Sequence, residues 1–117
     1  MISNIQKQII ELKKENDVLI LAHSYQSPEI QEIADAVGDS FALSTYAMNY
    51  PHKTVVLCGV KFMAETVKIL SPEKKVILPI ANATCPMAEQ ISPQEIINFK
   101  QKNPIFKVVA CKYYCRT

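Results

Sequence analysis

One cysteine, Cys85, lies in a short polar loop that follows an apolar run, in the stretch LPIANATCPMAEQ. A thiolate in such a loop is a candidate metal ligand, and thiolates suit zinc or iron–sulfur clusters. A metal site needs several ligands, but neither a CxxC pair nor a Cys/His quartet accompanies Cys85. The stretch CKYYC adds Cys111 and Cys115. One interpretation is therefore a small metal- or anion-binding α/β module that uses these three cysteines, with His23 as a possible fourth ligand.

His23 and Tyr25 lie two residues apart in AHSYQSPEI, directly after an apolar run. If the backbone there is still extended, both side chains project to the same side. An imidazole and a phenol together can bind a carboxylate or phosphate and move protons. In the alternative interpretation, the histidine only caps a neighbouring backbone group and the tyrosine packs on a helix. The spacing leaves both open.

Ser40 stands where a helix is expected to begin. Its hydroxyl, beside the free N–H groups of a helix start, would form an anion site. The alternative is an ordinary N-cap, a role that Asp39 could share. Cys58 lies inside an apolar run and is expected to be a small buried side chain.

Apolar runs and helical patterns alternate along the chain. The strands are expected at 17–23, 53–59, 74–80 and 105–110, and the helices near 5–12 and at 27–40, 41–50, 61–70 and 93–103. Strands that alternate with helices through short loops indicate a parallel sheet with helices on both faces. We therefore predict an α/β fold, a three-layer αβα sandwich with a four-stranded parallel sheet, in a single domain spanning residues 1–117.

In such folds, ligands gather at the carboxyl ends of the strands. The polar residues that follow the first three strands are therefore the functional candidates, and they are expected to converge on one edge of the sheet. They are 23–25 after the first strand, Gly59 and Lys61 after the second, and 82–85 after the third.

Composition narrows the function classes. The chain has 117 residues, of which 49% are hydrophobic and 21% charged, and its net charge is +2. Mixed charges with so small a net value give no nucleic-acid footprint. No apolar run reaches the length of a membrane span, and no signal peptide is visible. We expect a cytoplasmic location, in which the four cysteines stay reduced.

Three blocks of the sequence, in order and with compatible spacing, resemble quinolinate synthase, the iron–sulfur enzyme of bacterial NAD biosynthesis. They are LAHSYQSPEIQEIADAVGDS, VVLCGVKFMAETVKILSPEKKVILP and ATCPMAEQI, within residues 17–90. The resemblance implies the first of three pseudo-symmetric αβα domains, which meet at a [4Fe–4S] cluster. It implies that Cys85 is one of three cluster ligands and that the other two belong to sibling domains missing from this sequence.

The resemblance also implies the reaction, in which iminoaspartate and dihydroxyacetone phosphate condense to quinolinate. By the same resemblance, His23 and Ser40 would bind the dicarboxylate substrate and Tyr25 would assist proton movement. Two positions depart from the family pattern. Ser24 stands where the family often has tyrosine or asparagine, and Lys61 stands where histidine is common, which adds a cation near the site.

A third departure is the end of the sequence. After VVA the family typically continues YVNTTAELK, whereas this chain reads CKYYCRT. For one choice of codons, deleting the first two bases of the family stretch yields the observed residues followed by a stop. We therefore expect a frameshift, or a sequencing error with that effect, near Cys111, and we expect the chain to be inactive alone. Sequencing the gene beyond Thr117 tests this hypothesis.

Overall fold

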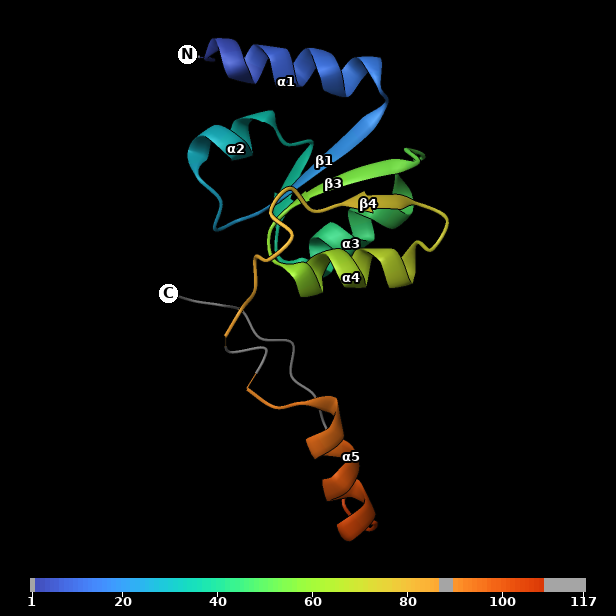
Figure 1. The fold of residues 1–117 in the computed structure, drawn as a ribbon. Coiled ribbons are helices and arrows are strands. Elements are labelled where there is room, and N and C mark those ends of the chain that lie inside the picture. The colour runs from blue at the N-terminus through green and yellow to red at the C-terminus, as the bar shows by residue number, and fades with distance from the viewer. Residues whose placement is uncertain (1, 87–89, 109–117) are drawn as a thin grey trace. The chain divides into compact units, whose positions relative to one another are not determined.

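The computed structural model describes residues 2–86 and 90–108 of the chain (Figure 1). The chain divides into two compact units, Met1–Thr84 and Cys85–Thr117. Among the described residues, the first unit contains a sheet with its helices and the second contains one helix. The single domain over residues 1–117 stays a prediction.

The sheet of the first unit has four parallel strands in the order β2-β1-β3-β4. Their bounds are β1 Val18–His23, β2 Ala36–Gly38, β3 Thr54–Cys58 and β4 Lys75–Ile77. Strand β1 lies in the centre and is buried along almost its whole length, which explains why its sequence is continuously apolar. The predicted α/β fold with a four-stranded parallel sheet is confirmed.

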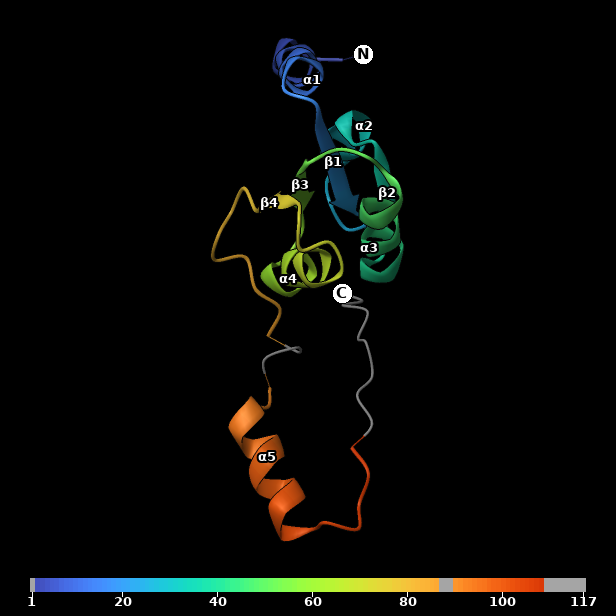
Figure 2. The ribbon, with the colours of Figure 1, turned by 90° about the vertical axis from the view of Figure 1, so that its right-hand side faces the viewer.

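Helices flank this sheet on both faces (Figure 2). On one side, α1 and α2 contact each other and β1, whereas α3 and α4 pack together on the other side. Their bounds are α1 Asn4–Glu15, α2 Pro28–Ile33, α3 Ser40–Asn49 and α4 Lys61–Leu70. The arrangement is that of the predicted three-layer sandwich.

The core lies between the sheet and the α3–α4 layer. Leu19 and Leu21 of β1 and Val55 and Leu57 of β3 are at most 1% exposed, and Leu43 of α3 is fully buried. These positions alternate along the strands, as expected for side chains that share one face of a sheet. The core thereby fixes the register of β1 against β3, in which Leu21 lies opposite Leu57.

The helix predicted over residues 27–40 is wrong in its second half. Helix α2 ends at Ile33, and residues 36–38 form strand β2 instead. The N–H of Asp35 donates to the carbonyl of Ile20 (2.7 Å), and the Asp35 carboxylate accepts from the N–H of Ile20 (2.7 Å). The backbone N–H and C=O groups of this segment therefore form hydrogen bonds with β1, in place of the bonds that they would form within a longer helix.

The prediction of a strand at residues 105–110 is also wrong for residues 105–108, the part of it that the structure describes. Residues 105–108 are irregular, and positions 109 and 110 lie outside the described residues. Apolar residues form a strand only where a neighbouring strand accepts and donates hydrogen bonds. Within the described part of the chain, all strand pairing involves β1 to β4. The sheet therefore has the predicted four strands, but residues 36–38 supply the strand that was expected at 105–110.

In the second unit, the predicted helix is confirmed as α5, Pro93–Lys102. Its start carries a capping box, because Ser92 Oγ accepts from the N–H of Glu95 (3.2 Å) and the Glu95 carboxylate accepts from the N–H of Ser92 (2.6 Å). Across the residues that the structure describes, none of the helices has the length and apolar character needed to span a membrane.

Candidate functional site at the carboxyl edge of the sheet

His23 is the last residue of β1 and marks the centre of the candidate site. It is only 4% exposed, and its partner on the neighbouring strand β2 is Gly38. On the β3 side lies Gly59, where an added methyl carbon would be 3.7 Å from the Cβ of His23. From β1 the chain continues to β2 on one side and later to β3 on the other, so His23 lies where the strand order reverses. Ligands bind at this point in open α/β sheets.

A tight turn after β1 places Tyr25 against His23. The N–H of Gln26 donates to the carbonyl of His23 (2.9 Å), and the N–H of Tyr25 donates to Nδ1 of His23 (3.2 Å). The two rings lie with their centroids 4.5 Å apart and their planes tilted by 42°. Tyr25 is 48% exposed. The structure therefore brings the buried imidazole and the accessible phenol together, but through a turn and not through an extended backbone. The bond from the Tyr25 N–H to Nδ1 also agrees with the alternative interpretation, in which the histidine caps a neighbouring backbone group.

The environment of His23 favours a neutral imidazole. Burial lowers the pKa of His23 below its ordinary value of 6.5, and the negative charge of Asp39 opposes this effect to a lesser degree. Because Nδ1 accepts the Tyr25 N–H, the proton of the neutral ring resides on Nε2. His23 therefore offers one N–H donor, which suits an anionic or carbonyl oxygen.

Ser40 is the first residue of α3 and is 6% exposed. The N-cap is Asp39, whose carboxylate accepts from the N–H of Ala42 (2.8 Å). The N-cap role that the sequence offered to both residues is therefore confirmed for Asp39 and wrong for Ser40. The carbonyl of Ser40 accepts from Ser44 Oγ (2.7 Å), which is a bond within the helix. Ser40 follows Gly38, the strand partner of His23, by two residues and so belongs to the same edge.

The exits of β3 and β4 meet at this edge as well. The N–H of Lys61, the first residue of α4, donates to the carbonyl of Ala83 (2.8 Å). The predicted convergence is therefore confirmed as far as Ala83. Lys61 and Ser24, the two positions expected from the resemblance to depart from the family pattern, are both exposed.

A small cavity of about 180 Å³ opens beside these exits. It is lined by Gln26, Ile30, Cys58, Gly59, Val60, Pro79, Ile80 and Ala83. The Cys58 thiol is free and partly exposed, not fully buried as its apolar surroundings in sequence suggested. Burial nevertheless raises the pKa of Cys58, so that its neutral form is favoured.

Cys85, the predicted metal ligand, belongs to the second unit. It is 4% exposed and is disulfide-bonded. A disulfide sulfur is not the thiolate that iron or zinc requires, so Cys85 fits a metal only after reduction. Among residues 2–86 and 90–108, no three His, Cys, Asp or Glu side chains form a group able to hold a metal ion. Cys111 and Cys115 lie outside the described residues.

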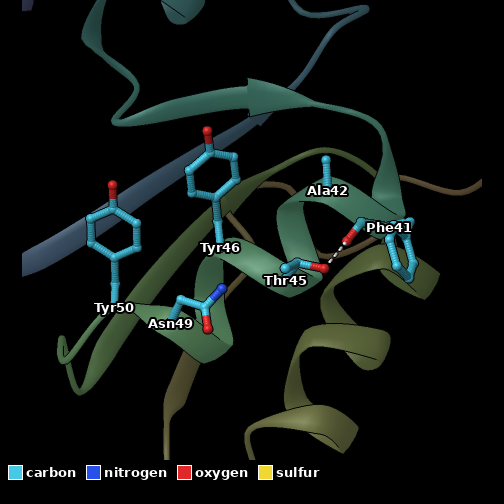
Figure 3. A pocket seen from close by; sticks show the side chains of 6 residues that line it. All are labelled: Phe41, Ala42, Thr45, Tyr46, Asn49 and Tyr50. Atoms are coloured by element: carbon cyan, nitrogen blue, oxygen red, sulfur yellow. Dashed lines mark hydrogen bonds between the residues drawn. The ribbon is translucent and has the colours of Figure 1, made fainter.

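A second hollow, of about 340 Å³, lies along α3 (Figure 3). Exposed aromatic side chains dominate its lining, which consists of Phe41, Ala42, Thr45, Tyr46, Asn49 and Tyr50. The Thr45 hydroxyl donates to the carbonyl of Phe41 (3.0 Å). None of the candidate site residues predicted from the sequence lines this hollow.

One residue of the edge was not found from the sequence. Gln31 of α2 donates through Nε2 to the carbonyls of Ser24 (3.1 Å) and Gln26 (2.7 Å). In the sequence it is one polar residue of a helical pattern, and nothing in its spacing indicates that its amide reaches back to the preceding turn.

Comparisons with known proteins find related sequences over most of this chain. The family model described as quinolinate synthetase A protein matches residues 7–114. The chain is 52% identical over 109 residues to the quinolinate synthase of Clostridioides difficile (strain 630), across 93% of this chain and 36% of that protein. It is 55% identical over 107 residues to the quinolinate synthase of Alkaliphilus metalliredigens (strain QYMF), across 92% and 35%. The chain thus spans about a third of the length of these curated relatives.

Proposed function

Since the chain belongs to the quinolinate synthetase A family, we propose that it is the amino-terminal part of a quinolinate synthase. The complete enzyme would condense iminoaspartate with dihydroxyacetone phosphate to quinolinate, for NAD biosynthesis. The observation that carries the proposal is the buried His23 at the reversal of strand order, with Tyr25 against its ring. A neutral donor beside an accessible phenol suits an oxygen-rich anionic substrate.

His23 and Ser40 are proposed to bind a carboxylate of the dicarboxylate substrate. Nε2 of His23 has a proton to donate, and Ser40 begins a helix whose first N–H groups favour negative charge. Burial of both residues strengthens these hydrogen bonds, because water competes less there. Tyr25 is proposed to hold or move a proton at the substrate, since its hydroxyl belongs to a half-exposed side chain beside the imidazole.

Cys85 is proposed to be one of three thiolate ligands of a [4Fe–4S] cluster. Such a cluster, when bound, supplies an iron with an open position that acts as a Lewis acid. Reduction of the Cys85 disulfide is the first requirement. Two further cysteines would come from the remaining two thirds of a complete enzyme of the length of the relatives. For that reason we propose that the chain is inactive by itself. The alternative of a small metal-binding module with Cys111 and Cys115 stays a prediction.

A chimera tests the function directly. Residues 1–108 of this chain replace the matching segment of the Clostridioides difficile relative, and quinolinate is measured by chromatography after anaerobic purification and cluster reconstitution. We expect the chimera to form quinolinate, and the His23→Gln variant to be slower by about a hundredfold or more, as for loss of an acid–base or orienting group. Ser24→Ala is the matched control, because Ser24 is exposed at the same turn.

Two measurements separate the parts of this proposal. Iron content and cluster absorbance of the Cys85→Ser chimera report on ligation without depending on turnover, and we expect both to fall. If the unaltered chimera holds a cluster but forms no quinolinate, the proposed function of this segment is wrong. Unchanged cluster content in the Cys85→Ser chimera would remove Cys85 from the ligand set while leaving the roles of His23 and Ser40 intact.

A further inference from the structure

We propose that Gln31 is a positioning residue, which holds the turn formed by residues 23–26 and thereby keeps Tyr25 placed on His23. The importance of that placement for substrate rests on the proposed function. The placement itself is a property of this chain and can be measured without any substrate.

The geometry of the Gln31 amide carries the inference. Its single Nε2 nitrogen has two hydrogens and donates to two carbonyls of the turn, those of Ser24 (3.1 Å) and Gln26 (2.7 Å). These two carbonyls flank Tyr25 in sequence. Tyr25 therefore lies between two points of attachment, and its own N–H is aligned with Nδ1 of His23 (3.2 Å).

Helix α2, which presents Gln31, is itself firmly attached. Gln6 of α1 is buried, and its Nε2 donates to the carbonyl of Glu29 (2.9 Å) and to the carboxylate of Glu32 (3.0 Å). Ile33, the last residue of α2, is also buried. The amide of Gln31 thus links the turn to a fixed element, whereas the side chain of Tyr25 is itself half exposed.

Loss of the Gln31 donors has a specific chemical consequence. The two turn carbonyls would bond to water, and the turn would no longer be restricted to the conformation in which the Tyr25 N–H meets Nδ1. Without that donor, Nδ1 can carry the proton, and the imidazole then populates both neutral tautomers. Gln31 therefore determines which nitrogen of His23 can donate to a ligand.

The test uses the 117-residue chain and ¹⁵N NMR of its imidazoles, with a His52→Gln variant to assign the two histidines. Gln31→Met keeps the side-chain length but removes both donors, and Gln31→Lys restores donors of similar reach. We expect the Nε2–H to Nδ1–H ratio of His23 to fall about fivefold in Gln31→Met, as for one ordinary hydrogen bond. Gln31→Lys should recover most of the ratio.

The matched control is Gln94→Met, because Gln94 is an exposed helical glutamine that also donates one side-chain bond, to Asn98 (2.9 Å). It should leave His23 unchanged. An unaltered tautomer ratio in Gln31→Met overturns the inference, and so does an equal loss in Gln31→Lys, since both results would show that the donors do not matter. If Gln31→Met does not fold, Gln31→Glu removes the same donors, and an unaltered tautomer ratio in that variant overturns the inference in the same way.

A titration with succinate, a stable four-carbon dicarboxylate, keeps the two proposals apart. A shift of the His23 signals that disappears in Ser40→Ala supports the proposed binding role. If succinate leaves His23 unaffected in the unaltered chain, this binding role fails in the isolated chain, whereas the tautomer ratios still decide whether Gln31 positions the turn.

Discussion

Asp35 is bonded to Ile20 twice, once through its backbone N–H and once through its carboxylate, each at 2.7 Å. The other carboxylate oxygen accepts from Lys13 Nζ at 3.0 Å. One side chain therefore joins α1, the start of β2 and the middle of β1. This arrangement ends α2 at Ile33 and directs the chain back along the sheet toward the edge where His23 lies.

Replacing Asp35 by Ala is expected to destabilise the chain by about 2–3 kcal/mol. The change leaves the N–H of buried Ile20 without its acceptor, and such an unpaired group costs roughly 1–3 kcal/mol. Urea unfolding followed by circular dichroism measures the effect. Lys13→Met is the control: it removes the partly exposed ion pair with Asp35 and the bond to the carbonyl of Ile33 (3.1 Å). It should cost less, because Ile20 stays bonded. Equal losses in the two variants would contradict this assignment.

The stability of the chain should fall on acidification because of His23. Its pKa in the folded chain is lowered, mainly by burial, so below about pH 6.5 the unfolded chain binds more protons than the folded one. The contribution is therefore fully present above pH 6.5 and is lost as the pH falls toward the lower folded pKa. Urea unfolding at a series of pH values from 8 to about 5 measures it.

The control for this pH dependence is the other histidine. His23→Gln should flatten the decline between pH 7 and 5, whereas His52→Gln should retain the His23 component. His52 lies at the opposite end of the strands, before β3, with its Nε2 3.5 Å from the Asp17 carboxylate. A decline that is unchanged in His23→Gln would show that His23 is not responsible.

Lys74 is expected to be essential for the loop that precedes β3. Although it is only 5% exposed, its ammonium donates to the carbonyls of Tyr50 (2.6 Å) and His52 (2.5 Å). Lys74→Met should cost about 2–3 kcal/mol, since hydrogen bonds from a charged donor are lost and carbonyls are left unpaired. It should also accelerate amide exchange at Lys53 and Thr54. The neighbouring exposed Lys75→Met should change stability by only about 0.5 kcal/mol.

Gly38 closely approaches α3, and we expect an added side chain to be unfavourable there. A methyl carbon added at Gly38 would lie 3.0 Å from the Cβ of Ala42, a backbone-anchored atom that cannot move aside easily. Gly38→Ala should therefore cost about 1–3 kcal/mol, as overpacked sites do. Gly59→Ala should cost less, because its nearest contact is the flexible Met63 thioether at 3.2 Å.

A double-mutant cycle tests the cause of this loss. Ala42→Gly removes the contacting methyl group, so the Gly38→Ala/Ala42→Gly pair should lose less stability than the sum of the two single changes. Additive losses would show that contact with Ala42 is not the reason for glycine at position 38.

The parallel α/β layout could be predicted from the residue pattern alone, because its signals are local. The apolar run ending at His23 predicts a strand buried on both faces, and Pro93 after Ser92 predicts the start of α5. The positions of His23, Gly59 and Lys61 at one edge followed from topology, since every parallel strand ends on the same side of the sheet. These features depend on the order and spacing of apolar, polar and proline residues along the chain.

The remaining features could be seen only in the folded chain, because each depends on hydrogen bonds that the residue pattern does not reveal. Residues 36–38 form a strand because they pair with β1, to which the preceding Asp35 also bonds at Ile20, while the largely apolar residues 105–108 do not form one. The same holds for the tautomer of His23, which the bond from the Tyr25 N–H sets, and for the bond from the Gln31 amide to the carbonyl of Ser24. Both bonds form only when the chain folds. Residue patterns specify which groups exist, whereas packing decides which donor meets which acceptor.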